Sequence, residues 1–172
     1  MRLILISTPI GYLGSGRGGG VELTLNSLVS GLIELGHSVK VVAPYKSNLL
    51  INGAELFTVK GSEQKSWQHQ DYNSHIQIPR DSLLVAMVEK AISLSKNADL
   101  ILNLSYDWLP IWMTMNIEKP IFHLISMANE SGAINDVIAD IYSRFPNNFA
   151  FHTKVQASDY SFIQKPQIVG NG

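Results

Sequence analysis

Short continuous runs of apolar residues alternate with stretches in which apolar residues recur every three or four positions. Leu3 to Ile6 is a run of the first kind and predicts a strand that is buried on both faces, and Val39 to Ala43, apolar except for Lys40, predicts a second strand. Between them, apolar residues from Val21 to Leu35 follow a helical spacing, and Gly36 stands where a helix commonly ends. The chain therefore opens with a strand, a helix and a second strand.

The same alternation continues along the rest of the chain. Further strands are expected at residues 55–59, 99–104, 121–125, 149–151 and 167–169. Helices are expected after an N-cap at Asp81 to near Asn97, after an N-cap at Asp107 through Trp112, from Ile134 to Phe145 with Pro146 closing it, and between the last two strands.

Strands without apolar and polar alternation, separated by helices, are typical of a parallel sheet that is covered on both sides. The 172 residues suffice for one well-packed domain. The sequence thus predicts a doubly wound, Rossmann-like α/β fold, with a parallel sheet of about six or seven strands and helices on both faces. Ligands of such folds bind beyond the carboxyl ends of the strands. These positions are residues 7–20, 44–46, 105–107, 126–130, 152–153 and 170–172.

Composition removes several classes of function. There is no cysteine, so disulfide frameworks, thiolate metal sites and cysteine nucleophiles are excluded. The net charge of −1 offers no basic surface for nucleic acid. The first apolar run is too short for a secretion signal, and no run is long enough to span a membrane. We therefore expect a cytoplasmic protein without a transmembrane segment.

Six of the thirteen glycines fall within residues 11–20, between the first strand and the first helix. Glycine allows a positive φ and a close approach of ligand to backbone, so successive amides can converge on an anion at the start of a helix. A phosphate or sugar-hydroxyl site that includes Gly18, Gly19 and Gly20 is the functional interpretation, and a mobile surface loop is the alternative. Arg17 would assist as a cation or would be an ordinary solvated loop residue.

The spacing Gly14-x-Gly16-x-x-Gly19 also matches the dinucleotide-binding fingerprint. In that fold the first glycine directly follows the strand, and an acidic residue ends the second strand to hold the ribose. Here seven residues intervene after Ile6, and no Asp or Glu occurs between Glu34 and Glu55. Lys46 could meet the extra phosphate of NADP, so an NADP-binding oxidoreductase domain stays as an alternative.

The order of several motifs resembles the N-terminal domain of family 4 glycosyltransferases of the GT-B fold. These motifs are Gly19-Gly20-Val21-Glu22 at a helix start, Leu35-Gly36-His37 before the second strand, Asp99-Leu100-Ile101 with a polar turn through Asp107, Lys119-Pro120-Ile121, and Ile168-Val169-Gly170-Asn171-Gly172 as a hinge. The resemblance covers nearly all of residues 1–172. It implies that this chain is the acceptor-side half, that a separate C-terminal domain binds the donor, and that the chain alone is inactive.

The activity implied by the resemblance is transfer of a sugar from a nucleotide-sugar, a UDP- or GDP-sugar, to an acceptor hydroxyl with retention of configuration. No further cofactor and no metal is implied. The acceptor would be a sugar or a lipid-linked molecule, which leaves contact with the inner face of a membrane open. The glycine amides would stabilise the leaving diphosphate. A non-enzymatic interaction domain remains the third class of function.

The resemblance also places single residues in the site. Where the family commonly has a histidine after a strand, alignment through Pro120 puts Ser126, and we expect the nearby His123 to be a core residue. Asp107 is a candidate acceptor-facing carboxylate or a helix N-cap. Candidates for binding donor or acceptor are Arg17, Gly18, Gly19, Gly20, Glu22, Tyr106 and Asn129. For Glu22, a place in the first helical turn is the simpler explanation.

Residues 61–79 form a polar, irregular segment that holds Trp67, His69, Tyr72 and His75. Aromatic rings stack on sugars, and long loops in compact domains are often functional, so one hypothesis is that this segment selects the acceptor. Plain surface disorder is the alternative. The two histidines lack chelate spacing, and no metal site is expected from them.

Overall fold

The computed structural model describes residues 1–170, which form one seven-stranded sheet in which all strands are parallel. The strands are β1 (Arg2–Ile6), β2 (Ser38–Pro44), β3 (Ala54–Val59), β4 (Leu100–Asn103), β5 (Ile121–Ile125), β6 (Phe149–Phe151) and β7 (Gln167–Ile168). Their order in the sheet is β3-β2-β1-β4-β5-β6-β7. The doubly wound, Rossmann-like α/β fold expected from the sequence is confirmed.

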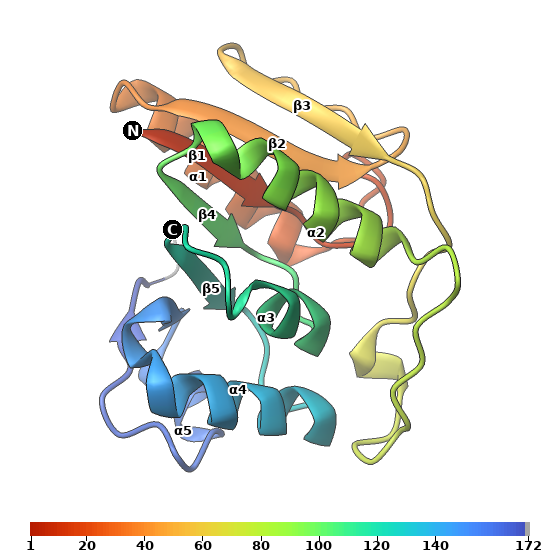
Figure 1. The fold of residues 1–172 in the computed structure, drawn as a ribbon, viewed down its shortest axis with the longest axis vertical. Coiled ribbons are helices and arrows are strands. Elements are labelled where there is room, and N and C mark those ends of the chain that lie inside the picture. The colour runs from red at the N-terminus through yellow and green to blue at the C-terminus, as the bar shows by residue number, and fades with distance from the viewer. Residues whose placement is uncertain (171–172) are drawn as a thin grey trace.

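Five α-helices connect the strands. They are α1 (Gly20–Glu34), α2 (Leu83–Leu94), α3 (Trp108–Thr114), α4 (Gly132–Arg144) and α5 (Lys154–Ser158). In Figure 1, α2, α3 and α4 lie in front of the sheet, and α1 lies behind it. Each crossover returns the chain to the end of the sheet at which the strands begin, as parallel strands require.

The sheet is buried on both faces because alternate residues of its central strands enter two different clusters. Ile4 and Ile6 of β1 pack with Leu84 and Met87 of α2. Leu3 and Leu5 of the same strand belong to the cluster on the opposite face, which α1 covers with its buried residues Leu25 and Val29. The continuous apolar runs in the sequence arise from this double burial.

Some element boundaries differ from the sequence prediction. The N-cap of α2 is Ser82, whose hydroxyl accepts a hydrogen bond from the Val85 amide, and the predicted cap at Asp81 is wrong. Asp81 instead accepts a hydrogen bond from the hydroxyl of Ser62. Asp99 and Leu104 lie just outside β4, and Val169 lies just outside β7. The predicted cap at Asp107 is confirmed for α3.

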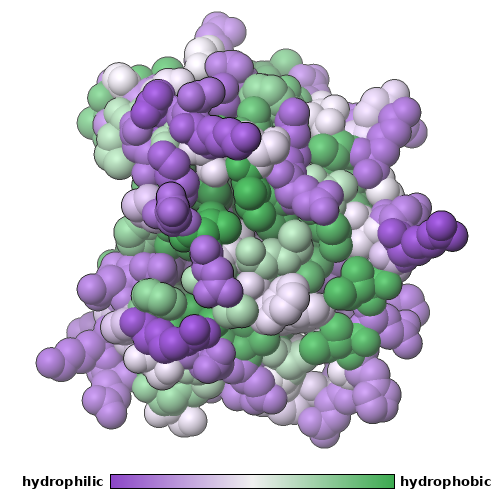
Figure 2. Space-filling model, in the orientation of Figure 1, coloured by the Kyte–Doolittle hydropathy of each residue, from purple (hydrophilic) through white to green (hydrophobic). Residues whose placement is uncertain are grey.

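Figure 2 shows apolar side chains across the middle of the face that α2, α3 and α4 form, with hydrophilic side chains around them. No helix among residues 1–170 is both long enough and apolar enough to cross a lipid bilayer. Most of the predicted hinge motif precedes residue 171. Its last two positions, 171 and 172, lie outside the described residues.

Two glycines near the end of α1 differ in backbone conformation, and alanine at each position should change the free energy of unfolding in opposite directions. Gly36 has φ +80° and Gly31 is helical, yet a Cβ would meet open space at both positions. We expect Gly36→Ala to lower the free energy of unfolding by about 1–2 kcal/mol, because the left-handed conformation costs that much with a Cβ. Gly31→Ala should raise it by about 0.5–1 kcal/mol. Urea denaturation of both variants measures the difference, and equal effects would contradict this account.

Candidate functional site

A pocket of about 420 Å³ lies beyond the carboxyl ends of β1, β4, β5 and β6. The order of the strands reverses between β1 and β4, and a crevice at this position is the usual ligand site of an open parallel sheet. The loop after β1, the start of α1 and the turns after β4, β5 and β6 form most of the wall. Residues 64–68, which follow β3, form the remaining side.

Seven of the nine residues proposed from the sequence line this pocket. They are Arg17, Gly18, Gly19, Gly20, Tyr106, Asp107 and Ser126. The remaining two, Glu22 and Asn129, do not line it. The fold thus brings together residues that are up to 109 positions apart in the sequence, from Arg17 to Ser126.

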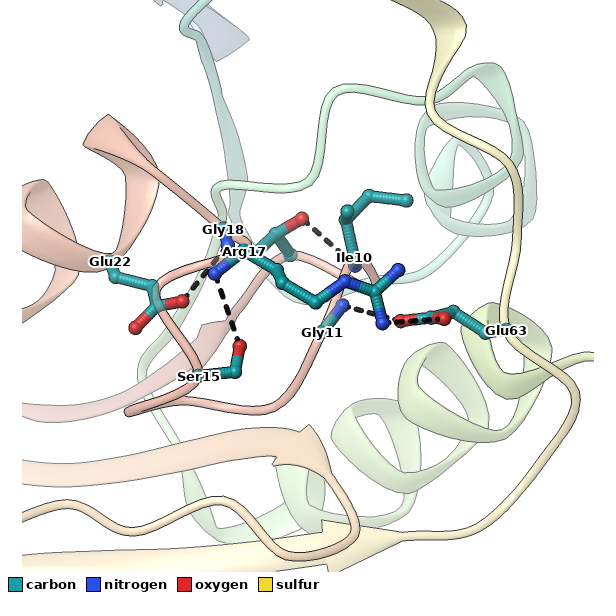
Figure 3. Close-up of polar contacts among 8 residues, drawn as sticks. Ile10, Gly11, Ser15, Arg17, Gly18, Glu22 and Glu63 are labelled. Carbon is teal, nitrogen blue, oxygen red and sulfur yellow. Dashed lines mark hydrogen bonds and ion pairs between the residues drawn. The ribbon is translucent and has the colours of Figure 1, made fainter. Parts of the chain in front are cut away.

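The glycine-rich loop is held by one carboxylate of α1. Glu22 accepts hydrogen bonds from the amides of Gly14 and Gly18, both at 2.9 Å, and Figure 3 shows the contact with Gly18. A Cβ at Gly18 would lie within 3.0 Å of Glu22 and of Thr8, so the loop packs too closely there for another residue. Glu22 therefore orders the loop rather than facing the pocket.

Two amides at the start of α1 are left without a partner. Within residues 1–170, neither the Gly19 amide nor the Gly20 amide donates a hydrogen bond to a protein atom. Both residues line the pocket, and Gly19, with φ +54°, turns the chain into the helix. Unpaired amides and the positive end of a helix of 15 residues together favour an anionic group at this point. Of the three predicted glycine amides, the Gly18 amide is already occupied by Glu22.

Arg17 is tied to a distant part of the chain. Its guanidinium lies 3.0 Å from a carboxylate oxygen of Glu63, and the other oxygen of that carboxylate accepts a hydrogen bond from the Gly11 amide at 2.6 Å (Figure 3). The side chain of Arg17 is 61% exposed, so the ion pair is screened by solvent and contributes at most about 1 kcal/mol. A ligand in the pocket can therefore compete for this arginine at low cost.

Asp107 is a buried carboxylate with three hydrogen-bond donors. One oxygen caps α3 by accepting from the Leu109 amide at 2.9 Å, and the other accepts from Trp67 Nε1 at 2.6 Å and Gln64 Nε2 at 2.7 Å. The residue is 2% exposed, and this burial raises the pKa of Asp107 to about 6, although the hydrogen bonds partly oppose the shift. The N-cap interpretation from the sequence is thus realised, and Asp107 also binds the segment after β3.

Tyr106, which follows β4, is hydrogen-bonded to the loop after β5 and to Tyr160. Its hydroxyl donates to the carbonyl of Ala128 at 2.9 Å and accepts from the amide of Glu130 at 3.1 Å and from the hydroxyl of Tyr160 at 3.2 Å. Burial raises the pKa of the Tyr106 hydroxyl, so it remains protonated and keeps its role as a donor. The hydroxyl thus donates one hydrogen bond and accepts two, and these bonds hold the loop that follows β5.

Ser126 presents the opposite case. Its hydroxyl oxygen is enclosed and has no hydrogen-bond partner among the described residues, although the residue lines the pocket. A buried hydroxyl without a partner costs free energy, and a small shift of the turn would let this oxygen form a hydrogen bond with a molecule in the pocket. No other residue proposed from the sequence combines a place in the pocket with an enclosed side-chain atom that lacks a partner within residues 1–170.

His123 is a core residue, as expected. It is 1% exposed, its Nδ1 lies 3.2 Å from Asn103 Nδ2, and its ring packs against Phe149. The Asn103 amide oxygen accepts from the Ser105 amide, so the Asn103 nitrogen faces the histidine as a donor. Burial lowers the pKa of His123 to about 3, and the ring is neutral and outside the pocket.

Asn129 and Glu22 contact protein atoms elsewhere. Asn129 donates to Asn135 Oδ1 at 2.9 Å, near the start of α4. Glu22 lines a separate surface depression with Gly14 and Asn26. No group of three or more His, Asp or Glu side chains lies together as a metal site in the part of the chain that the structure describes.

The turn at the end of β2 lies where the dinucleotide alternative would place part of its cofactor. The ribose of such a cofactor would lie at this strand end. Here the glycine-rich loop folds across it, because the Asn48 amide donates to the Leu13 carbonyl at 3.1 Å and the Leu13 amide donates to the Ser47 hydroxyl at 2.9 Å. Lys46 is the single non-glycine residue of the described chain with a positive φ, which marks a tight turn. The glycine-rich loop and the turn after β2 are therefore bonded together at this strand end.

Sequence reasoning did not find the roles of Glu63 and Gln64. Both lie in the polar segment after β3, and their contacts with Arg17 and Asp107 join residues 43 or more positions apart. No local pattern in the sequence marks such pairs. Thr8, Met127 and His152 also line the pocket, and each follows directly or closely after a strand, as the topological rule predicts.

Comparison with known proteins adds no relative. No family model matches this sequence, and no curated protein matches it significantly.

The raised pKa of Asp107 predicts a specific dependence of stability on pH. Between pH 4 and pH 6 the folded protein keeps a proton that the unfolded chain has released, so the free energy of unfolding should fall as the pH rises through this window. In Asp107→Asn this part of the slope should vanish. Urea denaturation at several pH values measures it, with the exposed Asp136→Asn as the control. An unchanged slope in Asp107→Asn would refute the assignment.

Proposed function

We propose that this chain is the acceptor-side domain of a glycosyltransferase that uses a nucleotide-sugar, and that its pocket holds the phosphate-bearing part of the reacting molecules. One observation carries the proposal. Gly19 and Gly20, whose amides are unpaired within residues 1–170, and Ser126, whose hydroxyl is unpartnered there, line the same pocket at the reversal of the strand order. These are donors, and a diphosphate or a sugar hydroxyl supplies the acceptors.

The chemistry follows from where charge develops. When the bond between the anomeric carbon and the diphosphate breaks, negative charge grows on the leaving diphosphate, a new bond forms from that carbon to the oxygen of the acceptor hydroxyl, and the hydroxyl proton passes to the leaving diphosphate. Amides that already point at this position stabilise that charge without reorganisation. The Gly19 and Gly20 amides and the positive end of α1 are suited to this role, and Arg17 adds a cation when it leaves Glu63.

Ser126 is suited to a hydrogen bond with the sugar or the acceptor. Its hydroxyl can donate and accept, and it meets no protein partner within the described residues. The turn that carries it is fixed by Tyr106, and by Gln156, whose Nε2 donates to the carbonyl of Ile125 at 2.8 Å. A fixed turn favours a positioning role for Ser126 in the transfer, because the backbone that carries its hydroxyl is held in place.

The proposal places the residues that bind the donor nucleotide outside positions 1–172. A form of the protein that carries further residues after Gly172 should release nucleotide from one of UDP-, GDP- or ADP-sugar, and the 172-residue chain should not. Nucleotide release is measured for both forms with each donor, and NADP binding serves as the control. Absence of release with every donor, together with tight NADP binding by the 172-residue chain, would refute the proposal in favour of a dinucleotide site.

A further inference from the structure

The segment of residues 61–79, which we call the strap, crosses from β3 to α2 along the open side of the pocket. It contains a single turn of regular structure, the helical turn Trp67–His69. At its start, the Ser62 amide donates to the carbonyl of Asp81 at 2.8 Å. Farther along, the carbonyl of Tyr72 accepts from the Gly132 amide at 2.9 Å, at the beginning of α4. Between these two points the strap is free of backbone bonds to the rest of the described chain.

One side chain anchors this middle part. Trp67 is 5% exposed and packs in the cluster that contains Ile111, Ile125 and Ile134. Its neighbours Gln64, Lys65 and Gln68 are half-buried or exposed. A segment with a single buried apolar anchor opens at a lower free energy than the core does.

The polar atom of this anchor is bound by Asp107. The carboxylate accepts hydrogen bonds from Trp67 Nε1 and Gln64 Nε2 with the same oxygen, and its other oxygen caps α3. Hydrogen bonds to a carboxylate are stronger than those between neutral groups. The strap is also linked through Glu63, whose ion pair with Arg17 is exposed and therefore weak and whose other oxygen accepts a hydrogen bond from the Gly11 amide at 2.6 Å. Of these links, the contact with Asp107 is the one that holds the buried anchor Trp67 and its neighbour Gln64.

We propose that Asp107 is a positioning residue that seats the strap, and that the seated strap is a movable wall which controls passage of ligand into the pocket. Two facts favour this over a direct chemical role for Asp107. Three donors already occupy its oxygens, and the residue is 2% exposed. The same strap residues that Asp107 binds, Gln64 and Trp67, line the pocket. The seating itself is independent of the proposed function, and only the ligand's identity depends on it.

Trp67→Phe tests the seating, because it removes the N–H and keeps an aromatic ring in the core. We expect the His69 and Gln70 amides, which are bonded within the strap, to exchange with deuterium at least tenfold faster. The Leu109 amide, bonded to the other oxygen of Asp107, should keep its rate. Trp112→Phe is the matched control, since Trp112 is 53% exposed and is not bonded to Asp107.

Gln64→Met provides a second variant that removes the other donor without touching the core. It should speed exchange at the same two strap amides by a smaller factor. Unchanged strap exchange in both variants would overturn the proposal. An equal increase in Trp67→Phe at strap amides and at core amides such as Leu5 would also overturn it, because Trp67 would then act on global stability alone.

Rate constants of ligand binding distinguish a strap that controls entry to the pocket from a strap that only contacts the bound ligand. Pyrophosphate is the probe, followed by NMR exchange on labelled protein. In Trp67→Phe we expect the association and the dissociation rate constants of pyrophosphate both to rise, each by about tenfold. A rise in dissociation alone would contradict gating. If pyrophosphate binds to no form, the phosphate pocket is refuted, and the exchange data still decide whether Asp107 seats the strap.

Discussion

The parallel direction of all seven strands is the constraint on which the site depends. Because all strands have their carboxyl ends on the same side of the sheet, the loops after β1, β4, β5 and β6 meet there, although they come from distant parts of the sequence. The reversal of strand order between β1 and β4 separates these loops into two groups and leaves a pocket between them. The crossovers also bury both faces of the sheet.

The sequence predicted the fold well because double burial leaves a clear pattern. Runs such as Leu3 to Ile6 have no polar face, and the structure buries them on both sides. The predicted cap at Asp107 is correct and the one at Asp81 is wrong, since Ser82 stands one position later and its side chain also accepts from the helix. Neighbouring capping residues of this kind cannot be ranked from local sequence, because both have the required chemistry.

The candidate site was predictable only in part. Gly19 and Gly20 were identified by their place at the start of a helix, and Ser126 by the resemblance that aligns it through Pro120. Glu22 was found as a residue of the first helical turn, but its bonds to the amides of Gly14 and Gly18 depend on how the loop folds back. The strap's contacts with Asp107 link distant segments through single side chains, and such contacts leave no periodic signal in a sequence.

The measurement that tests the phosphate pocket most directly compares Gly20→Pro with Gly20→Ala. Gly20 is the first residue of α1, where proline is tolerated, and a Cβ there meets open space. Proline removes the N–H and alanine keeps it. The account predicts that pyrophosphate, titrated by calorimetry, binds Gly20→Ala like the original chain and binds Gly20→Pro about tenfold or more weakly, as expected for losing a hydrogen bond to a charged group. Equal affinities for the two variants would contradict it.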